Sequence, residues 1–262
     1  MAQTDPVRER LTRVAVVLVD TSHPGNIGAV ARASKNMGIH CLRLVRPRQF
    51  PHADATARAS GADDLLARAE VFDTLEEAIA DAALVYGASA RRRSLQWPEQ
   101  NAREAAREIL SKEAQVSVVF GNERSGLSNA ELDCCHRLLH ISANPEYSSL
   151  NLAMAVQVVT HELRMAATAG YGAGDDGRVE APFATSAQVE ALYEHYQRTL
   201  TATGFLNPDN PRHLMRRLRR LYNRVGLDDN EVQILRGILS AHDAALAAAG
   251  GRSAGEDDSR DR

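Results

Sequence analysis

The chain has 262 residues, of which 44% are hydrophobic and 25% charged, and it contains 9 prolines and 17 glycines. This is an ordinary globular composition, so it excludes a disordered or fibrous protein, and at roughly 100–200 residues per domain the length favours two domains. The formal net charge of −3 means that the molecule as a whole does not attract a polyanion, so any nucleic-acid site must be a local basic patch.

The chain lacks signals for membrane insertion, secretion and metal binding. No apolar run approaches the roughly 18 residues that cross a bilayer, and the start, Met1–Pro6, lacks the basic and then apolar pattern of a signal peptide. The three cysteines form no CxxC pair and no disulfide framework, and the nine histidines show no metal spacing. We therefore expect a cytoplasmic protein with no membrane segment, no disulfide and no metal.

Residues 13 to about 166 alternate short β-branched runs with helix-like segments, which predicts an α/β domain. The runs are nearly continuous in apolar character, as in strands of a parallel sheet covered by helices on both faces. The predicted strands are 14–19, 41–45, 84–87, 116–120 and 138–141. Capping signals predict a helix start at Asp73–Glu77 and another at Ser128, where Ser128 and Glu131 form a capping box.

The composition changes after this region, because residues 168–182 are glycine-rich and lack hydrophobic periodicity. We expect a flexible linker over 167–183 and a helical domain over 184–250. Its predicted helices, 186–203, 212–225 and 230–249, carry apolar residues at helical spacing. The polar and charged tail, 251–262, is expected to be disordered.

Several familiar active-site motifs are missing from the loops that follow the predicted strands. The first strand is followed by a GxxG without a GxGxxG, which disfavours a nucleotide-binding dehydrogenase. There is no GxxxxGK[ST] and no GxSxG, and His161–Met165 begins like HExxH but has methionine at the second ligand position. Metalloprotease and hydrolase interpretations are therefore poor.

What these loops do contain is a repeated theme of small and polar residues, at 26–32, 87–90, 121–127 and 148–151. Glycine and alanine permit close backbone approach to a ligand, while serine and asparagine offer hydrogen bonds without charge. The pattern indicates a site for a polar, largely neutral cofactor. Each loop taken alone is also explained by ordinary turn chemistry.

In combination the segments are more specific. The order Asn-x-Gly-x-x-x-Arg (Asn26–Arg32), Phe-Gly-x-Glu-x-x-Gly-Leu-Ser (Phe120–Ser128) and Ser-Leu-Asn-x-Ala (Ser149–Ala153) resembles the three motifs of the SpoU branch of the SPOUT methyltransferases. The resemblance extends over nearly the whole chain, apart from the linker and the tail. It implies a methyltransferase domain over 1–166 with a mostly parallel sheet and a C-terminal trefoil knot, a small all-α C-terminal domain, a homodimer, and S-adenosyl-L-methionine as cofactor.

Stretches 17–28 and 144–157 resemble family members that methylate the ribose 2'-oxygen of nucleotide 32, a C or U, in the tRNA anticodon loop. The resemblance therefore implies a tRNA (cytidine/uridine-2'-O-)-methyltransferase that binds RNA. Two alternatives stay open, the same chemistry on ribosomal RNA and an RNA-binding protein that keeps the fold without catalysing. Family motifs describe the reaction site, whereas substrate choice depends on surfaces outside it.

The resemblance also assigns roles to individual residues. Arg32 matches the motif arginine and is expected to act as a base or, since a guanidinium keeps its proton up to a pH of about 12, to position a phosphate or stabilise alkoxide charge. Asn26 and Glu123 orient Arg32 or the backbone, or brace the loops. Ser149 and Asn151 hold the substrate ribose or phosphate, unless Ser148 simply caps the following helix. The implied cofactor-binding residues are Ala88, Ser89, Ala90, Gly121, Ile141, Ser148, Ser149 and Leu150.

Two arginine clusters are candidate RNA contacts. Arg91, Arg92 and Arg93 directly follow a predicted cofactor loop, where they would meet RNA phosphates. Arg216, Arg219 and Arg220 fall on a predicted helix whose other face holds Leu214, Leu218 and Leu221. The alternative for this helix is packing through its leucines with the arginines in water.

Overall fold

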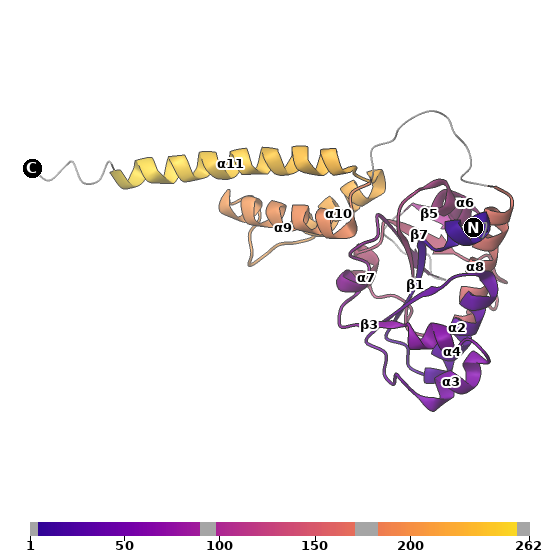
Figure 1. Ribbon diagram of the computed structural model, residues 1–262. Helices are drawn as coiled ribbons and strands as arrows, with labels where there is room; N and C mark the ends of the chain where they lie inside the picture. The colour runs from indigo at the N-terminus through magenta and orange to yellow at the C-terminus, as the bar shows by residue number, and fades with distance from the viewer. Residues whose placement is uncertain (1–4, 90–97, 171–182, 256–262) are drawn as a thin grey trace, which may run out of the picture. The chain divides into compact units, whose positions relative to one another are not determined.

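The computed structural model describes residues 5–89, 98–170 and 183–255. It divides into two compact units, Met1–Glu180 and Ala181–Arg262, which are described separately below (Figure 1). Most of the predicted linker, residues 171–182, lies outside the described residues.

The first unit contains a seven-stranded sheet with the order β3-β2-β1-β6-β4-β7-β5. Every neighbouring pair is parallel. The strands are β1 (Val14–Val19), β2 (Cys41–Val45), β3 (Glu70–Phe72), β4 (Leu84–Ala88), β5 (Glu99–Asn101), β6 (Val116–Phe120) and β7 (Arg137–His140). The parallel sheet and its five predicted strands are confirmed. The two edge strands, β3 and β5, were not predicted, because each has only three residues and no run of buried apolar side chains.

Eight helices of the described chain connect or cover the strands of this unit. They are α1 (Pro6–Leu11), α2 (Pro24–Met37), α3 (Ala53–Ala59), α4 (Asp63–Ala67), α5 (Leu75–Ala78), α6 (Ala102–Ser111), α7 (Asn129–Asp133) and α8 (Leu152–Thr168). Both predicted helix starts are confirmed. Thr74 and Glu77 form a capping box on α5, and Ser128 and Glu131 form one on α7.

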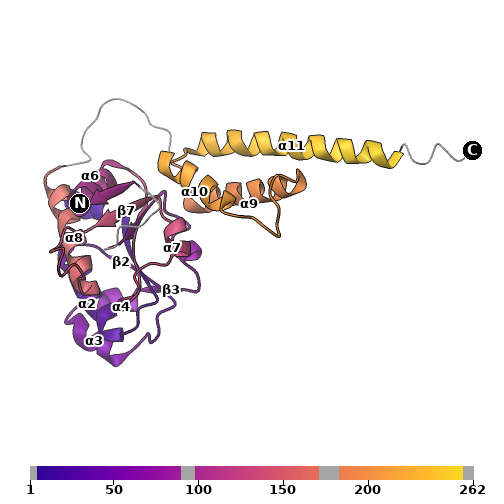
Figure 2. The same cartoon turned by 180° about the vertical axis from the view of Figure 1, so that it is seen from behind.

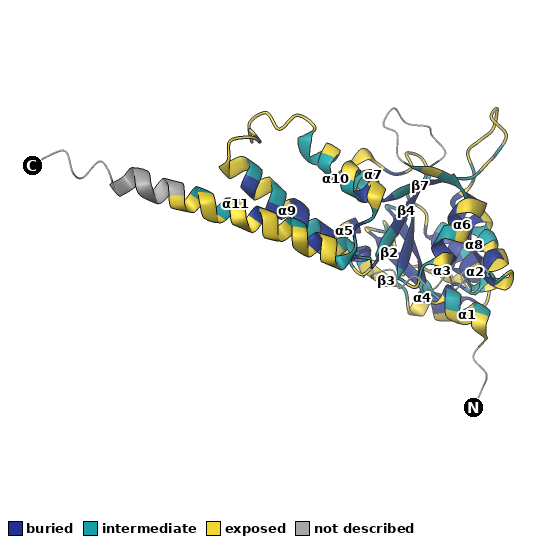
Figure 3. Cartoon of the chain, turned by 90° about the horizontal axis from the view of Figure 1, so that it is seen from above, coloured by how far each residue is buried: buried dark blue, intermediate teal, exposed yellow. Residues whose placement is uncertain are grey.

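The central strands of the sheet are buried (Figure 3). A separate core covers each face of the sheet, and alternate residues of β1 enter one core or the other. Val16 and Leu18 pack in the core beneath α2, α6 and α8. Val17 and Val19 pack in the opposite core, beneath α5 and α7. Figure 2 shows α2 and α8 on one side of the sheet and α7 on the other. Burial on both faces explains why the strands carry no polar alternation.

The second unit consists of α9 (Ser186–Ala202), α10 (Leu214–Val225) and α11 (Asp229–Gly255). These correspond to the three predicted helices. Its core includes Leu192 and Tyr193 of α9 and Val232 of α11. Helix α11 includes 251–255, five residues of the tail that was predicted to be disordered. The alanine-rich stretch before this segment favours helix propagation. Residues 256–262 lie outside the described residues.

The packing face of α10 differs from the prediction. Leu221 is 46% exposed, and the residues of α10 that enter the core are Met215 and Tyr222. Asn223 is buried and accepts a 2.7 Å hydrogen bond from the Tyr193 hydroxyl. Tyr222 can replace a leucine in this contact because a tyrosine buries a large ring while its hydroxyl still bonds to a neighbouring polar group.

Candidate active site

Four loops that carry the predicted motifs leave the same edge of the sheet. The carboxyl ends of parallel strands face one way, and β1, β6, β4 and β7 are consecutive neighbours in the strand order. The first motif follows β1 and the second follows β6, while the third stands between β7 and α8. Segments far apart in the chain therefore meet at one edge.

A cavity of about 250 Å³ opens among the loops that follow β4, β6 and β7. The lining includes Ala88, Ser89, Gly121, Ile141, Ser148, Ser149 and Leu150. These are all the predicted cofactor residues except Ala90, which lies outside the described residues. The cavity is also lined by the whole turn Asn122–Leu127 and by Leu152 and Ala155 of α8. The turn belongs to a loop whose composition indicated a cofactor site, although only Gly121 of that loop was named as a cofactor-binding residue; Leu152 and Ala155 were not named.

Gly121 lines the cavity and packs directly against the backbone of the turn that follows it. A Cβ at this position would lie 2.3 Å from both the Gly126 carbonyl carbon and the Leu127 nitrogen. The turn folds back on itself, since the Gly126 nitrogen donates to the Asn122 carbonyl at 2.8 Å and Gly126 has φ +67°. Glycine is thus required at 121 because backbone, not a movable side chain, occupies the space.

Glu123 joins the second motif to the first. Its Oε1 accepts a hydrogen bond from Asn26 Nδ2 at 2.8 Å, and its Oε2 accepts from the Ser22 backbone nitrogen at 2.9 Å and the Ser22 hydroxyl at 2.8 Å. Burial opposes ionisation, but the hydrogen bonds from Asn26 and Ser22 outweigh it and hold the pKa of Glu123 below its ordinary value. Glu123 is therefore a charged brace between two loops.

Arg32 does not take part in this network. It is exposed on α2, and within the described chain its side chain has no hydrogen-bond or ion-pair partner. Asn26 and Arg32 are six residues apart, which separates them by about 120° around a helix. Asn26 bonds to Glu123, and Glu123 bonds to the backbone of Ser22, whereas neither bonds to Arg32. Of their predicted roles, this geometry fits bracing of the loops.

In the third motif, Asn151 is the N-cap of α8, and its side-chain oxygen accepts a 2.9 Å hydrogen bond from the Ala153 nitrogen. The alternative in which Ser148 caps this helix is therefore wrong. Ser148 and Ser149 are exposed and line the cavity. The capping bond occupies one lone pair of the Asn151 amide and leaves its NH2 group for a ligand.

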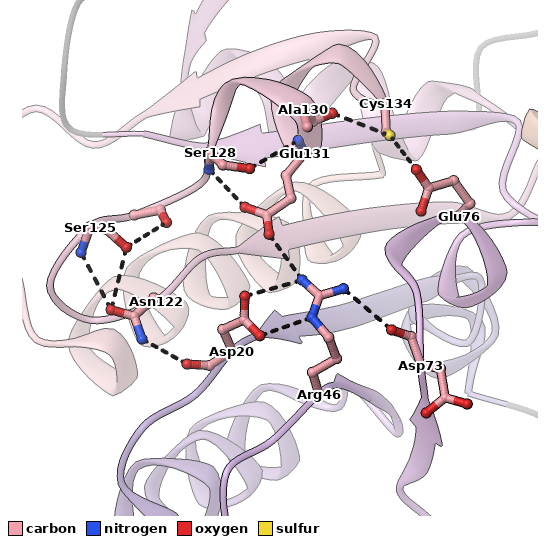
Figure 4. Close-up of polar contacts among 11 residues, drawn as sticks. Asp20, Arg46, Asp73, Glu76, Asn122, Ser125, Ser128, Ala130, Glu131 and Cys134 are labelled. Atoms are coloured by element: carbon pink, nitrogen blue, oxygen red, sulfur yellow. Dashed lines mark hydrogen bonds and ion pairs between the residues drawn. The ribbon is translucent and has the colours of Figure 1, made fainter.

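A network of hydrogen bonds and ion pairs around Arg46, which the sequence did not predict, supports the second motif (Figure 4). Arg46, directly after β2, binds both carboxylate oxygens of Asp20, at 3.0 and 3.1 Å, and Glu131 Oε1 at 3.2 Å. Asp20 in turn accepts, through its backbone carbonyl, a 2.7 Å hydrogen bond from Asn122 Nδ2. Glu131 caps α7. Arg46 thus holds both ends of the turn that lines the cavity.

The structure describes the predicted RNA contacts on α10 but not those at 91–93. Arg91, Arg92 and Arg93 lie outside the described residues. Arg219 pairs with Glu190 of α9, and its guanidinium carbon lies 4.6 Å from the Tyr193 ring centroid. This arginine therefore packs against α9, contrary to the expectation of a solvent-facing stripe. Arg216 and Arg220 are half-buried on the same helix.

The described ranges contain no cluster of histidine, cysteine, aspartate and glutamate able to hold a metal ion. No helix in that part of the chain is long and apolar enough to cross a membrane. The predicted cytoplasmic location stays a prediction.

Comparisons with known proteins agree with this architecture. Residues 13–161 match the SpoU rRNA Methylase family, and residues 187–253 match the C-terminal domain of the tRNA methyltransferase TrmJ. The sheet, the cavity and these matches define a SpoU-type enzyme, and the chain belongs to the SpoU methylase family.

The individual relatives that it resembles carry the name TrmJ. The tRNA (cytidine/uridine/adenosine-2'-O-)-methyltransferase TrmJ of Pseudomonas aeruginosa (strain UCBPP-PA14) is 50% identical over 240 residues, 88% of this chain and 93% of that protein. The tRNA (cytidine/uridine-2'-O-)-methyltransferase TrmJ of Klebsiella pneumoniae is 46% identical over 88% of this chain and 96% of that protein. The crystal structure of TrmJ from Z. mobilis ZM4 superposes with a TM-score of 0.78 at 36% identity, covering 87% of this chain and 97% of that chain.

Proposed function

We propose that the protein is an S-adenosyl-L-methionine-dependent methyltransferase that modifies the ribose 2'-oxygen of nucleotide 32, a C or U, in the anticodon loop of tRNA. The observation that carries the proposal is the cavity lined by the second and third motif loops, to which the first motif is joined by the hydrogen bond between Asn26 and Glu123. Relatives that align with 88% of this chain are named tRNA 2'-O-methyltransferases. The adenosine in the name of the Pseudomonas relative makes the accepted base a matter for measurement.

The cavity has the chemistry that such a cofactor requires. Its wall combines small residues, where backbone groups are within reach of a ligand, with the apolar side chains of Leu139 and Ile141 and the hydroxyls of Ser148 and Ser149. When bound there, S-adenosyl-L-methionine supplies an activated methyl group. Ala88, Ser89, Gly121, Ile141, Ser148, Ser149 and Leu150 would hold it, and Ala90 remains a predicted contact.

Arg32 and Glu123 have different roles in the proposed reaction. A ribose hydroxyl is a weak nucleophile, and charge develops on its oxygen as it reacts. A guanidinium group is a poor proton acceptor, so the role proposed for Arg32 is to position a phosphate or stabilise that charge. Glu123 is ionised, but both of its oxygens already accept hydrogen bonds, so it positions the loops in place of acting as the base.

We also propose that two copies of the chain associate through α8. Met154, Val158 and Met165 are 59%, 37% and 52% exposed on this helix. At about 100° per residue the three fall within about 40° of one another, so they form one apolar stripe. A monomer at micromolar concentration in sedimentation velocity would contradict this proposal. The trefoil knot and the domain bounds 1–166, 167–183, 184–250 and 251–262 also stay predictions.

The deciding experiment is methyl transfer from labelled S-adenosyl-L-methionine to tRNA that lacks this modification, with ribosomal RNA as the parallel substrate. Mass spectrometry of nuclease fragments locates the product. A 2'-O-methyl group at nucleotide 32 is the expected result. Transfer only to ribosomal RNA supports the alternative substrate, and cofactor binding without transfer to either RNA supports a non-catalytic RNA-binding protein.

A further inference from the structure

Arg48 and Arg58, from different parts of the chain, lie against the loop Thr21–Asn26 that begins the first motif. The backbone nitrogen of Arg48, which follows β2, donates to the Thr21 carbonyl at 3.1 Å. Arg58 of α3 lies over Gly25, because its Cδ and Nε are each 2.8 Å from the position that a Cβ on Gly25 would occupy. Both arginines are exposed.

Arg124 approaches the same loop from the second motif. It directly follows Glu123, whose carboxylate accepts hydrogen bonds from Ser22 and Asn26 of the loop. Arg124 is exposed and lines the proposed cofactor cavity. Arg48, Arg58 and Arg124, called here the arginine surface, thus stand on three segments that each contact this one loop.

The arginine surface carries positive charge that the described protein does not neutralise. Within the described ranges, none of its three side chains has a carboxylate or other hydrogen-bond partner. Elsewhere in this unit, Arg43 pairs with Asp81 at 2.6 Å and Arg68 with Asp64 at 2.8 Å. The adjacent Glu123 carboxylate is turned into the loop that it braces.

Such a cluster has a natural ligand in a polyanion. Guanidinium groups stay charged and form paired hydrogen bonds with phosphate oxygens, and phosphate contacts set the position and register of a nucleic acid. Arg32 lies seven residues beyond Gly25 on α2, about 10 Å farther along the helix. A backbone held at the arginine surface would thus continue toward both the cavity and Arg32.

We propose that Arg48, Arg58 and Arg124 bind consecutive backbone phosphates of the RNA substrate and deliver its ribose to the cavity. The proposal rests on the proposed function, because it takes tRNA as the ligand. It assigns RNA binding to residues of the methyltransferase unit that differ from the clusters at 91–93 and on α10. The surface reads the sugar-phosphate backbone and so contributes affinity and register in place of base preference.

The test compares RNA binding by two full-length triple variants that each lose three positive charges. One is Arg48→Ala, Arg58→Ala and Arg124→Ala. The control is Arg8→Ala, Arg13→Ala and Arg68→Ala. Arg13 directly precedes β1, and Arg8 and Arg68 both lower the pKa of His40, which directly precedes β2. The control arginines thus lie toward the amino-terminal edge of the sheet, opposite the site.

Affinity for unmodified tRNA is measured by fluorescence anisotropy over a series of salt concentrations. Each lost phosphate contact lowers the slope of log affinity against log salt by about 0.7–0.9, so the first variant should lose about two to three units of slope. Its affinity at physiological salt should fall about tenfold or more. S-adenosyl-L-methionine binding by the Arg48→Ala, Arg58→Ala double variant, measured by calorimetry, should match the wild type, because neither residue lines the cavity. The control variant should keep most of the tRNA affinity.

Equal affinity and slope in the two triple variants overturn the arginine surface, while methyl transfer by the wild type leaves the proposed function intact. Failure of the wild type to bind or methylate tRNA overturns both. If the triple variant loses its cooperative thermal transition, Arg48→Ala and Arg58→Ala singly take its place. Each is then expected to lose about one unit of salt slope, and an unchanged slope in both counts against the proposal.

Discussion

Asn26 Nδ2 lies 2.8 Å from Glu123 Oε1, a hydrogen bond that links the first and second motifs across 97 positions of the chain. The two residues follow β1 and β6, which pair in parallel register. The same carboxylate also accepts the backbone nitrogen of Ser22. One ionised side chain therefore sets the distance between the loop that begins α2 and the turn that lines the cavity.

Glu123→Gln should weaken cofactor binding and lower kcat, because an amide replaces a carboxylate that accepts several hydrogen bonds. It should also change the pH dependence of stability. The folded-state pKa of Glu123 lies below its unfolded value, so its stabilising effect is present above the unfolded pKa, near 4.5, and is lost as the pH falls through the folded pKa. Thermal unfolding of both proteins between pH 7 and pH 3 measures this. A stability difference that stays constant over the whole range would contradict the assignment.

Arg32→Ala should lower kcat by about 100-fold or more, the scale seen when one group that stabilises transition-state charge is removed. Arg32 does not line the cavity, so the dissociation constant for S-adenosyl-L-methionine should not change. Arg32→Lys retains the charge without the planar pair of donors, and it should recover part of the rate. Single-turnover methylation and calorimetry provide the two readouts. A normal rate for Arg32→Ala would remove this residue from the reaction.

Gly121→Ala should abolish cofactor binding. The added Cβ would meet backbone atoms of Gly126 and Leu127 at 2.3 Å, so the turn must move away and the cavity wall changes. The matched control is Gly237→Ala in α11, where the new methyl group meets no atom within 4 Å. That change should be neutral or stabilise the protein by up to about 1 kcal/mol, because alanine favours a helix. Retained cofactor affinity in Gly121→Ala would show that the wall is more plastic than its geometry indicates.

Gly28→Ala should lower thermal stability by forcing α2 away from α3. A Cβ on Gly28 would lie 1.9 Å from the Ala55 carbonyl oxygen, which belongs to the backbone of the neighbouring helix. Overpacking of this kind costs about 1–3 kcal/mol, or roughly 2–4 °C in melting temperature per kcal/mol for a domain of this size. Differential scanning calorimetry measures the shift. An unchanged melting temperature would mean that the two helices separate at no cost.

Arg46→Ala should raise the KM for S-adenosyl-L-methionine with only a small loss of stability. Its partners Asp20 and Glu131 hold the two ends of the turn, but the Arg46 side chain is 43% exposed and such pairs contribute about 1 kcal/mol or less. Arg68→Ala, which removes an exposed pair with Asp64, is the control and should leave the KM unchanged. Equal effects of the two changes would mean that Arg46 has no special connection to the site.

Sequence patterns predicted those features whose causes are local. The strand at 14–19 is a continuous apolar run, those at 41–45 and 116–120 are mostly apolar, and the capping box at Ser128 satisfies its own helix end. The three motifs could be read in the same way, since each is a short segment with its own composition.

Only the tertiary structure decided how distant residues combine. Edge strands β3 and β5 form because a neighbouring strand pairs with their backbone. Arg219 faces α9 because it pairs with Glu190 and packs on the ring of Tyr193 there. Strand order likewise decides that Arg46 meets Asp20 and that Asn26 meets Glu123. A chain encodes its local preferences residue by residue, whereas these contacts depend on which strands become neighbours. That choice is made by the burial of the whole sheet.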